Sequence, residues 1–189
     1  MSLVADNLKA AIKGESNAKR KYQLFSEQAA KENLTQIAIL FKAASYAESL
    51  HIKNHLKALS AITKATVNPE EFVKVDDNEL KNHVQDTRAN LQEAIDGETY
   101  EFKKMYKQFV KNAIKAGDLV SELTFRLARE AEKVHAKLYS NYLKQLEKNK
   151  EFEPVEIYVC TICGNIEFTP LPDICPVCDH DKKFFKKIE

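Results

Sequence analysis

Three observations predict an all-α four-helix bundle followed by a small metal-binding domain. Glycine and proline, which interrupt helices, are scarce, with 4 and 5 copies among 189 residues, and Pro69 is the first proline. Two Glu-x-x-His pairs, Glu48/His51 and Glu132/His135, each follow a Gly-Glu pair at a similar distance. All four cysteines lie near the carboxyl end in two Cys-x-x-Cys motifs. The first two observations indicate the bundle, and the third indicates the small domain.

The boundaries of the predicted helices follow from local signals. The first helix runs from about 4 to 31 and the second from about 35 to 63, where Thr35 can act as a cap. A long connection follows at about 64 to 86, and residues 79 to 85 within it form a helical turn. The third helix runs from about 87 to 115, and the fourth continues from the Gly117-Asp118 turn to about 148. Two short links and one long middle connection are typical of the ferritin-like topology.

A domain boundary is predicted after the fourth helix. The Lys-rich end of this helix is followed by a short acidic linker, Glu151 to Glu156, which contains Pro154. We therefore expect a ferritin-like domain at 1–150 and a cysteine-containing domain at 151–189.

The bundle sequence contains an internal duplication. GESNAKRKYQLF, which begins at Gly14, resembles GETYEFKKMYKQF, which begins at Gly97, and AESLH resembles AEKVH. The separation between Glu15 and Glu48 nearly equals that between Glu98 and Glu132. Two helical hairpins related by a pseudo-twofold axis would place all the ligand sets around one point.

The register of the apolar residues places these polar side chains in the core. A lone Glu-x-x-His usually belongs to a solvated helix face, but here each candidate lies on an apolar stripe with steps of three and four residues. The stripes of the four helices contain Glu15; Glu48 and His51; Glu98 and Glu101; and Glu132 and His135. The ferritin-like metal pattern takes one Glu from each of two helices and Glu-x-x-His from each of the others.

Five carboxylates in a bundle interior need compensating charge. A buried unpaired ion costs several kcal/mol, and two divalent or trivalent cations would remove that cost. Carboxylates with two histidines suit non-haem iron or manganese better than zinc or calcium. The sequence therefore predicts a redox-capable dinuclear metal centre.

The cysteines form a second candidate metal site. Cys160 and Cys163 make one Cys-x-x-Cys pair, and Cys175 and Cys178 make the other. In a reducing compartment this spacing favours a metal over disulfides, and four thiolates hold zinc or iron tetrahedrally. Spacing alone would favour a structural zinc ribbon, whereas attachment to a redox-capable centre favours an Fe(Cys)4 electron carrier.

Composition restricts the class of partner. The formal net charge is +1 with both signs interspersed, so we expect neither nucleic-acid binding nor a membrane-binding patch. Charged residues break every apolar run long before it could cross a membrane, and the start of the chain lacks the apolar stretch of a signal peptide. We expect a soluble, cytoplasmic protein.

The combined motifs resemble those of rubrerythrins. GESNAKRKY, AESLH, GETYEFKKMY and AEKVH are followed by YVCTICG and CPVC, and the resemblance covers essentially the whole chain in the same order. Tyr158 precedes the first knuckle as in rubredoxin-like domains, although Asn165 and Asp179 stand where tyrosine and glycine are common. The resemblance implies a diiron centre in the bundle and a mononuclear iron at the cysteines.

The resemblance also implies a role for each ligand. Glu48 and Glu132 would bridge both irons, and Glu15 would bind one iron. Glu98 and His135 would bind the other. The first iron would take either Glu101 or His51, depending on oxidation state. Tyr22 and Tyr106 would donate hydrogen bonds to ligand carboxylates, and His55 is expected to support the site or the core and not to bind metal.

The function implied is reduction of hydrogen peroxide to water in defence against oxidative stress. The Fe(Cys)4 unit would receive electrons from an NAD(P)H-dependent rubredoxin reductase or a rubredoxin. A ferroxidase is the principal alternative, although an electron-input domain is useful only if the centre is re-reduced. A zinc-ribbon interaction protein is a third reading, which the core-facing ligands disfavour.

A homodimer or larger assembly is expected from the helix lengths. A helix of about 28 residues is about 42 Å long. With ligands near its middle, the cysteine domain would start about 20 Å or more from its own dinuclear centre. A partner's domain could dock closer in a head-to-tail dimer.

Overall fold

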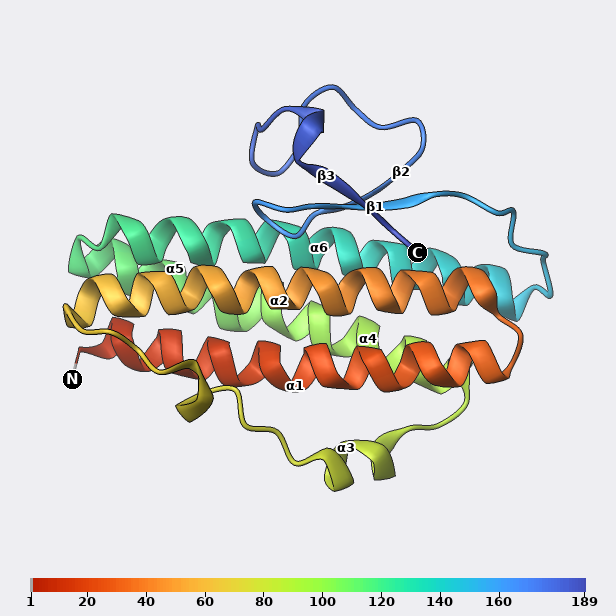
Figure 1. Cartoon of the computed structure of the whole chain (residues 1–189), viewed down its shortest axis with the longest axis horizontal. Coiled ribbons are helices and arrows are strands. Elements are labelled where there is room, and N and C mark those ends of the chain that lie inside the picture. Colours follow the sequence, from red (N-terminus) through yellow and green to blue (C-terminus); the bar gives the residue numbers. More distant parts are fainter. Residues whose placement is uncertain (1) are drawn as a thin grey trace.

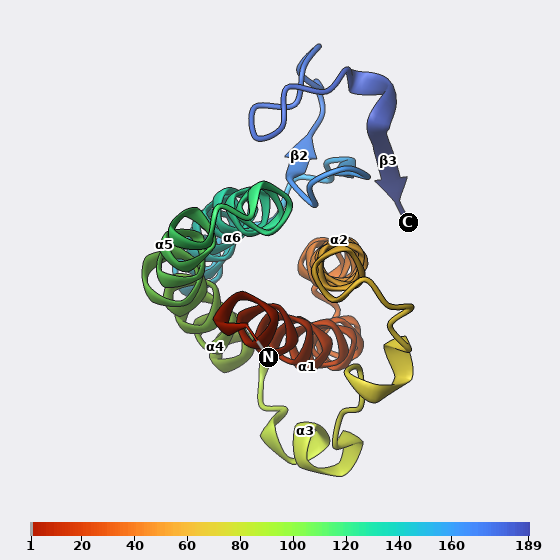
Figure 2. The same ribbon diagram turned by 90° about the vertical axis from the view of Figure 1, so that its left-hand side faces the viewer.

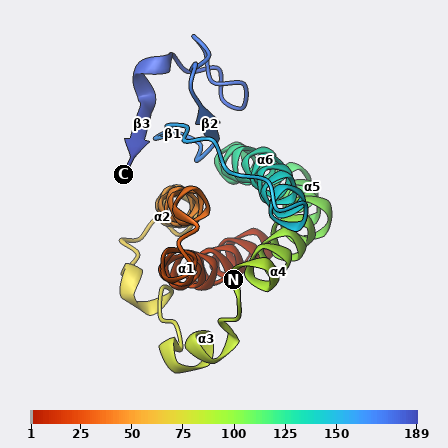
Figure 3. The ribbon, with the colours of Figure 1, turned by 90° about the vertical axis from the view of Figure 1, so that its right-hand side faces the viewer.

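Four long rods of helix form the body of the protein, for which a computed structural model describes residues 2–189. α1 (Leu3–Lys31) and α2 (Thr35–Thr63) form the first hairpin. The second consists of a composite third rod, with α4 (Thr87–Tyr100) and α5 (Tyr106–Ala116), and of α6 (Leu119–Glu147). The end-on views show the four rods around a common axis (Figures 2 and 3). The predicted ferritin-like bundle is therefore confirmed.

Short polar caps begin most of these helices. The side chains of Ser2, Asp86 and Asp118 accept hydrogen bonds from backbone amides at the starts of α1, α4 and α6. Gly117 ends α5 with a φ of 68°, a left-handed conformation that glycine adopts without strain. The expected cap at Thr35 is wrong, because Thr35 is already helical and Leu34 occupies the cap position without a side-chain hydrogen bond.

The third rod is not the continuous α-helix that was predicted for 87–115. A π-helical segment, η2 (Glu101–Met105), separates α4 from α5. The duplicated motif explains it, since the second copy, from Gly97 to Phe109, is one residue longer than the first, from Gly14 to Phe25. A π-turn absorbs one extra residue without breaking the helix. Residues on either side of the segment therefore keep their core-facing register.

The long connection crosses the outer side of the first hairpin. It contains the short helices η1 (Pro69–Glu71) and α3 (Asp77–His83), so the predicted turn at 79–85 begins two residues earlier. Arg20 on α1 contacts Asp77 at 2.5 Å and ties α3 to the bundle. Figure 1 shows this connection on the side of the bundle opposite to the carboxyl-terminal strands.

The carboxyl-terminal domain contains a three-stranded antiparallel sheet. β1 (Ile157–Cys160) lies between β2 (Ile166–Phe168) and β3 (Phe185–Ile188), and η3 (Lys182–Phe184) precedes β3. Ile157 pairs with Phe168 on one side and with Ile188 on the other. The domain lies over α2 and α6 (Figures 1 and 2). Hydrogen bonds from Gln36 to Val155 and from Asn54 to Ile162, each 2.9 Å long, attach it there.

Two apolar clusters flank the polar centre of the bundle. One contains Phe25, Phe41 and Tyr139, and the other contains Leu8, Leu59 and Phe125. The polar side chains between these clusters are buried, namely Glu15, Glu48, His51, Glu98, Glu132 and His135. Within residues 2–189, no helix has the length and apolar character needed to cross a membrane.

Candidate metal centres

Two overlapping groups of ligand atoms lie in the middle of the bundle. The first group consists of Glu15, Glu48, His51 and Glu132, and the second of Glu48, Glu98, Glu132 and His135. All are buried, and the ligand atoms of each group lie within 4.8 Å of one another. Glu48 and Glu132 belong to both groups, so the arrangement has the geometry of two metal positions that share two carboxylates.

Several of the ligand atoms form no hydrogen bond, although Nδ1 of His135 lies 2.8 Å from Glu132 within the cluster. Among the described residues, buried atoms without a hydrogen bond include Oε2 of Glu15, Oε1 of Glu48, Oε2 of Glu98, both carboxylate oxygens of Glu132 and Nδ1 of His135. Buried polar atoms in folded proteins are almost always satisfied. Converging lone pairs of carboxylates and imidazoles are what two cations would bind, so the residues fit a dinuclear metal site.

The pKa values of these groups reflect the burial of several carboxylates close to one another. Burial, followed by the neighbouring carboxylates, raises the pKa of Glu48 and Glu98 well above the ordinary value. Glu132 is different because, despite its burial, His51 and His135 lower its pKa to about 2. Burial opposes protonation of His51, yet Glu132 and the other carboxylates raise its pKa well above 6.5. Without metal, His51 thus holds a proton that a bound cation would replace.

Backbone carbonyls orient both histidines. Nε2 of His51 lies 2.9 Å from the carbonyl oxygen of Cys163, and Nε2 of His135 lies 3.0 Å from that of Gly164. A carbonyl only accepts, so each Nε2 carries a hydrogen, and each Nδ1 faces the carboxylates. Nδ1 of His51 lies 2.9 Å from Glu48, and Nδ1 of His135 lies 2.8 Å from Glu132. The cysteine knuckle thereby leaves Nδ1 of both rings directed at the metal positions.

This contact overturns the expected separation between the cysteine domain and its own bundle. Cys163 and Gly164 touch the bundle histidines of the same chain, so the wide gap predicted from the helix length is wrong. Such a gap requires the domain to stay near the end of the last helix. Instead, the chain turns back after α6, and β1 runs along the bundle toward its middle (Figure 1). A partner chain is therefore not required for close approach.

Gly164 permits this approach. A Cβ atom at this position would lie 2.5 Å from Nε2 of His51, and the φ of Gly164 is 81°. The Cys-x-x-Cys-Gly motif marks Gly164 in the sequence, but its proximity to His51 has no sequence signal.

Two tyrosines reach across the bundle to the outer carboxylates. The Tyr22 hydroxyl on α1 donates to Glu98 on α4 at 2.6 Å, and the Tyr106 hydroxyl on α5 donates to Glu15 on α1. Both hydroxyls are buried, and burial followed by nearby carboxylates raises both pKa values. Each tyrosine therefore remains protonated. It donates its hydrogen bond to a glutamate in the other half of the duplication.

Glu101 lies beside the site but outside both ligand groups. It opens the π-helical segment and is half-buried, and its Oε1 would lie 3.9 Å from a Cβ added to Gly14. Burial, then Glu15, then Glu132 raise its pKa. His51 occupies the first group in its place.

His55 is buried and hydrogen-bonded. Its Nε2 lies 2.9 Å from the Tyr106 hydroxyl, and its Nδ1 lies 3.0 Å from Oγ1 of Thr124. Burial lowers its pKa to about 3. The ring lies outside both ligand groups, and its contact with Thr124 is not predicted by the sequence. A polar Thr124 within an apolar stripe was the available sequence signal.

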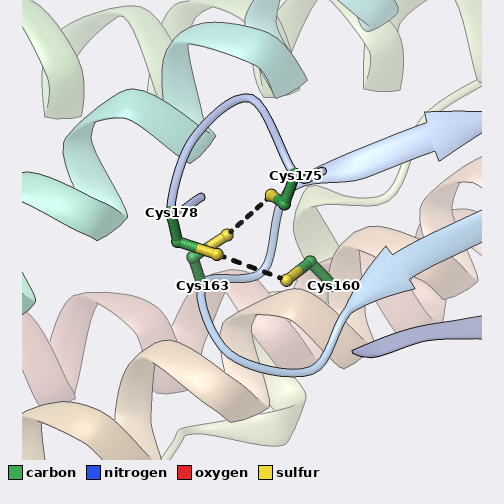
Figure 4. A group of neighbouring side chains, drawn as sticks. All are labelled: Cys160, Cys163, Cys175 and Cys178. Atoms are coloured by element: carbon green, nitrogen blue, oxygen red, sulfur yellow. Dashed lines mark hydrogen bonds between the residues drawn. The ribbon is translucent and has the colours of Figure 1, made fainter. Parts of the chain in front are cut away.

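The four cysteine sulfurs converge, as Figure 4 shows. Sγ of Cys160 lies 3.6 Å from that of Cys178, and Sγ of Cys163 lies 3.6 Å from that of Cys175. Four ligands at about 2.3 Å from one tetrahedral ion would be about 3.8 Å apart, so this arrangement fits a single metal. Three of the four residues are buried.

The fold and the two sites define a class of protein: a ferritin-like dinuclear metal protein that carries a four-cysteine metal domain. Residues 6–143 match the rubrerythrin family, and residues 158–186 match the rubredoxin-like domain of rubrerythrins. The chain belongs to the rubrerythrin family. It has a diiron site in the bundle and a mononuclear iron site at the cysteines, and it is an oxidoreductase of that family.

Individual relatives are similar over nearly their full length. Rubrerythrin-1 of Clostridium acetobutylicum is 35% identical, with 96% of this chain and 92% of the relative covered. Rubrerythrin-2 of the same organism is 32% identical, with 98% and 96% covered. A solved structure described as a mixed-valence state of nigerythrin has a TM-score of 0.87 and 28% identity, with 99% of this chain and 87% of that chain covered.

Proposed function

We propose that this protein reduces hydrogen peroxide to water at the dinuclear site, with electrons delivered through the cysteine site. The reaction takes one peroxide, two electrons and two protons and yields two waters. Irons held by the two ligand groups would supply the redox chemistry for cleaving the O–O bond, and an iron held by the four cysteines would return electrons to them one at a time. A cytoplasmic NAD(P)H-dependent rubredoxin reductase, or a rubredoxin, is the proposed source of electrons.

One observation carries this proposal. The backbone of the Cys163–Gly164 knuckle contacts both bundle histidines, at 2.9 and 3.0 Å. The path from the Cys163 thiolate to His51 therefore consists of one residue and one hydrogen bond. Such a contact favours repeated re-reduction of the bundle site, which a peroxidase needs. A ferroxidase, the alternative, takes its electrons from ferrous iron and has no use for this contact.

The proposed residue roles follow the two ligand groups. Glu48 and Glu132 would hold both irons, Glu15 would hold one, and Glu98 with His135 would hold the other. His51 and Glu101 would alternate on the Glu15 side. A carboxylate favours ferric iron, and a neutral imidazole is comparatively better for ferrous iron. His51 within the ligand group and Glu101 beside it support this alternation.

The protons have nearby candidates. Glu101 is half-buried beside the site, and burial raises the pKa of its carboxyl above the ordinary value. Tyr22 and Tyr106 donate their hydroxyl hydrogens to Glu98 and Glu15, respectively, and so fix the orientation of those carboxylates. We therefore assign proton delivery to Glu101 and carboxylate orientation to the tyrosines.

The test compares two oxidants. Anaerobically reduced, iron-loaded protein is mixed with hydrogen peroxide or oxygen in a stopped-flow instrument, and reoxidation is followed optically. We expect faster oxidation by peroxide, and turnover with NADH plus a rubredoxin reductase. The Cys160→Ser variant serves as the control, because its bundle should still react once with peroxide but not turn over. Reaction with oxygen at least as fast as with peroxide would favour the ferroxidase.

A further inference from the structure

A chain of buried polar side chains extends from one edge of the metal-ligand cluster. The Tyr106 hydroxyl, which donates to Glu15, also contacts Nε2 of His55 at 2.9 Å. Nδ1 of His55 lies 3.0 Å from Oγ1 of Thr124. Glu15, His55, Tyr106 and Thr124 come from α1, α2, α5 and α6 and are all buried. One chain of contacts therefore joins all four rods of the bundle.

The hydrogen bonds between Glu15, Tyr106, His55 and Thr124 can be oriented in two directions. A tyrosine hydroxyl has a single hydrogen. In one arrangement Tyr106 donates to Glu15, Nε2 of His55 donates to Tyr106, and Thr124 donates to Nδ1. In the other, Tyr106 donates to His55, and Glu15 loses its donor. Hydrogen bonds to an ionised carboxylate are stronger than neutral ones, and an unmade bond to a buried group is costly, so the first direction is favoured.

This direction also decides which oxygen of Glu15 is free. Tyr106 donates to Oε1, whereas Oε2 has no hydrogen-bond partner and lies 3.8 Å from Nδ1 of His51. Oε2 is therefore the atom available to a metal. A Tyr106 hydroxyl that turned toward His55 would no longer hold the carboxylate in this orientation.

The continuation through a histidine occurs on the Tyr106 side of the pseudo-twofold axis. Tyr22 donates to Glu98 in the other half, but the position that corresponds to His55, four residues after the second histidine, is Tyr139. The Tyr139 ring packs against the Tyr22 ring, with centroids 5.7 Å apart. The other metal position thus provides an internal comparison within the same molecule.

We propose that His55, held by Thr124, is a positioning residue for the metal position that contains Glu15 and His51. Its Nε2–H donates to the Tyr106 oxygen and keeps the tyrosine hydrogen on Glu15. The inference rests on the proposed role of Glu15 as a metal ligand and is independent of peroxide turnover.

Substitution pairs separate hydrogen bonding from packing. His55→Leu removes the donor, whereas His55→Gln keeps an N–H that can reach Tyr106. Thr124→Val removes the hydroxyl, and Thr124→Ser keeps it. Zinc binding to each full-length variant is measured by competition with a chelator, and thermal unfolding of the metal-free protein is measured in parallel. We expect His55→Leu to lower the affinity for one of the two bundle zinc ions by about tenfold, as loss of a supporting hydrogen bond does. His55→Gln and Thr124→Ser should bind zinc as the original chain does.

NMR of the diamagnetic zinc-loaded protein gives a second readout. The nitrogen signals of His55 should show a protonated Nε2 and an unprotonated Nδ1. In His55→Leu, the ring signals of His51 should change with zinc occupancy at lower affinity, while those of His135 should not.

Two results would overturn the proposal. One is a His55 ring protonated at Nδ1 alone in the zinc-loaded protein. The other is a His55→Leu variant that folds and binds both zinc ions as tightly as the original chain. A variant that fails to fold leaves the tautomer measurement as the deciding test. Zinc affinities that follow the expected pattern without any peroxide reduction would leave this inference standing and reject only the proposed function.

Discussion

His51 and His135 each divide their two nitrogens between the two metal sites. Nε2 contacts the cysteine knuckle, and Nδ1 faces the carboxylates. A neutral imidazole has one N–H and one nitrogen lone pair. Because the knuckle carbonyl takes the N–H at Nε2, the lone pair at Nδ1 is left for the metal position. The hydrogen bonds that dock the cysteine domain on the bundle therefore also leave Nδ1 of both histidines free to bind metal.

Gly164→Ala should disrupt electron delivery. The new Cβ would overlap Nε2 of His51, at 2.5 Å, and the knuckle would move away. We expect electron transfer from the cysteine iron to the bundle to slow by at least about tenfold, since the contact would lengthen. Stopped-flow oxidation of the reduced cysteine site after peroxide addition measures this rate.

Gly117→Ala is the matched control for that experiment. Its φ of 68° imposes comparable backbone strain, but no atom lies within 4 Å of the added Cβ. It should lower stability by about 1–2 kcal/mol without changing electron transfer. Equal slowing in both variants would mean that strain alone is responsible.

Glu101→Ala and Glu48→Ala should separate turnover from metal retention. Glu101 lies outside the ligand groups, so its loss should leave both irons bound in the reduced protein but slow peroxide turnover. Glu48 belongs to both groups, so its loss should release iron. Iron per chain and steady-state peroxide reduction are the measurements. Normal turnover in Glu101→Ala would refute the alternation between His51 and Glu101 and leave the diiron site intact.

Among the elements, the third rod departs most from a simple repeat. The π-helical segment begins at Glu101 and restores the register so that Tyr106 faces Glu15, as Tyr22 faces Glu98. The two halves therefore keep equivalent tyrosine contacts although their motifs differ in length by one residue. The extra residue falls in the segment that begins at Glu101, a glutamate without a counterpart in the first half.

The contact between α3 and α1, made by Asp77 and Arg20, should weaken at acidic pH. Hydrogen bonds from Arg20 and then Lys81 lower the pKa of Asp77 to about 2. An acid with a depressed pKa contributes its stabilisation above its unfolded pKa of about 3.9 and loses it as the pH falls through the folded value. Attachment of α3 should therefore weaken between about pH 4 and 2.

Pepsin cleavage within residues 64–86 checks this expectation. At about pH 4, Asp77→Asn should be cut faster than the original chain, and the difference should vanish near the folded pKa of about 2. Asp96→Asn, an exposed change on α4, should match the original chain throughout. A difference between Asp77→Asn and the original chain that is the same at both pH values would contradict the assignment.

At the scale of the whole molecule, the cysteine domain lies on its own bundle. The linker turns back after α6, and Gln36, Asn54 and both site histidines hold the domain over α2 and α6. The cysteine knuckle therefore contacts the bundle histidines within one chain, and the head-to-tail dimer expected from the helix length is not needed for this contact.

A complementation experiment distinguishes the two routes. Chains with Cys160→Ser lack the cysteine iron, and chains with Glu48→Ala lack the diiron site. With a within-chain route, mixed assemblies purified through two different tags should show no peroxide turnover beyond that of the separate variants. Substantial recovery in the mixed assemblies would show that electrons pass between chains.

Local patterns made most of the bundle predictable. The scarcity of helix-breaking residues placed the first two helices within a residue of their observed ends, although the expected Thr35 cap was wrong. The two Glu-x-x-His motifs located the buried ligand groups. Side chains three residues apart on a helix share a face whatever the rest of the fold does. Even the π-segment had a local sign, the extra residue between Glu98 and Tyr106.

The contacts between distant residues were decided only by the tertiary structure. The path of residues 151–156 brings Gly164 to His51, and the packing of α6 against α2 brings Thr124 to His55. Neither contact has a periodic pattern, because each depends on where the chain turns and how the rods pack. The sequence by itself determined which residues can bind metal. The tertiary structure decided that the cysteine domain reaches those residues within one chain, since a linker without regular structure does not reveal its direction from composition.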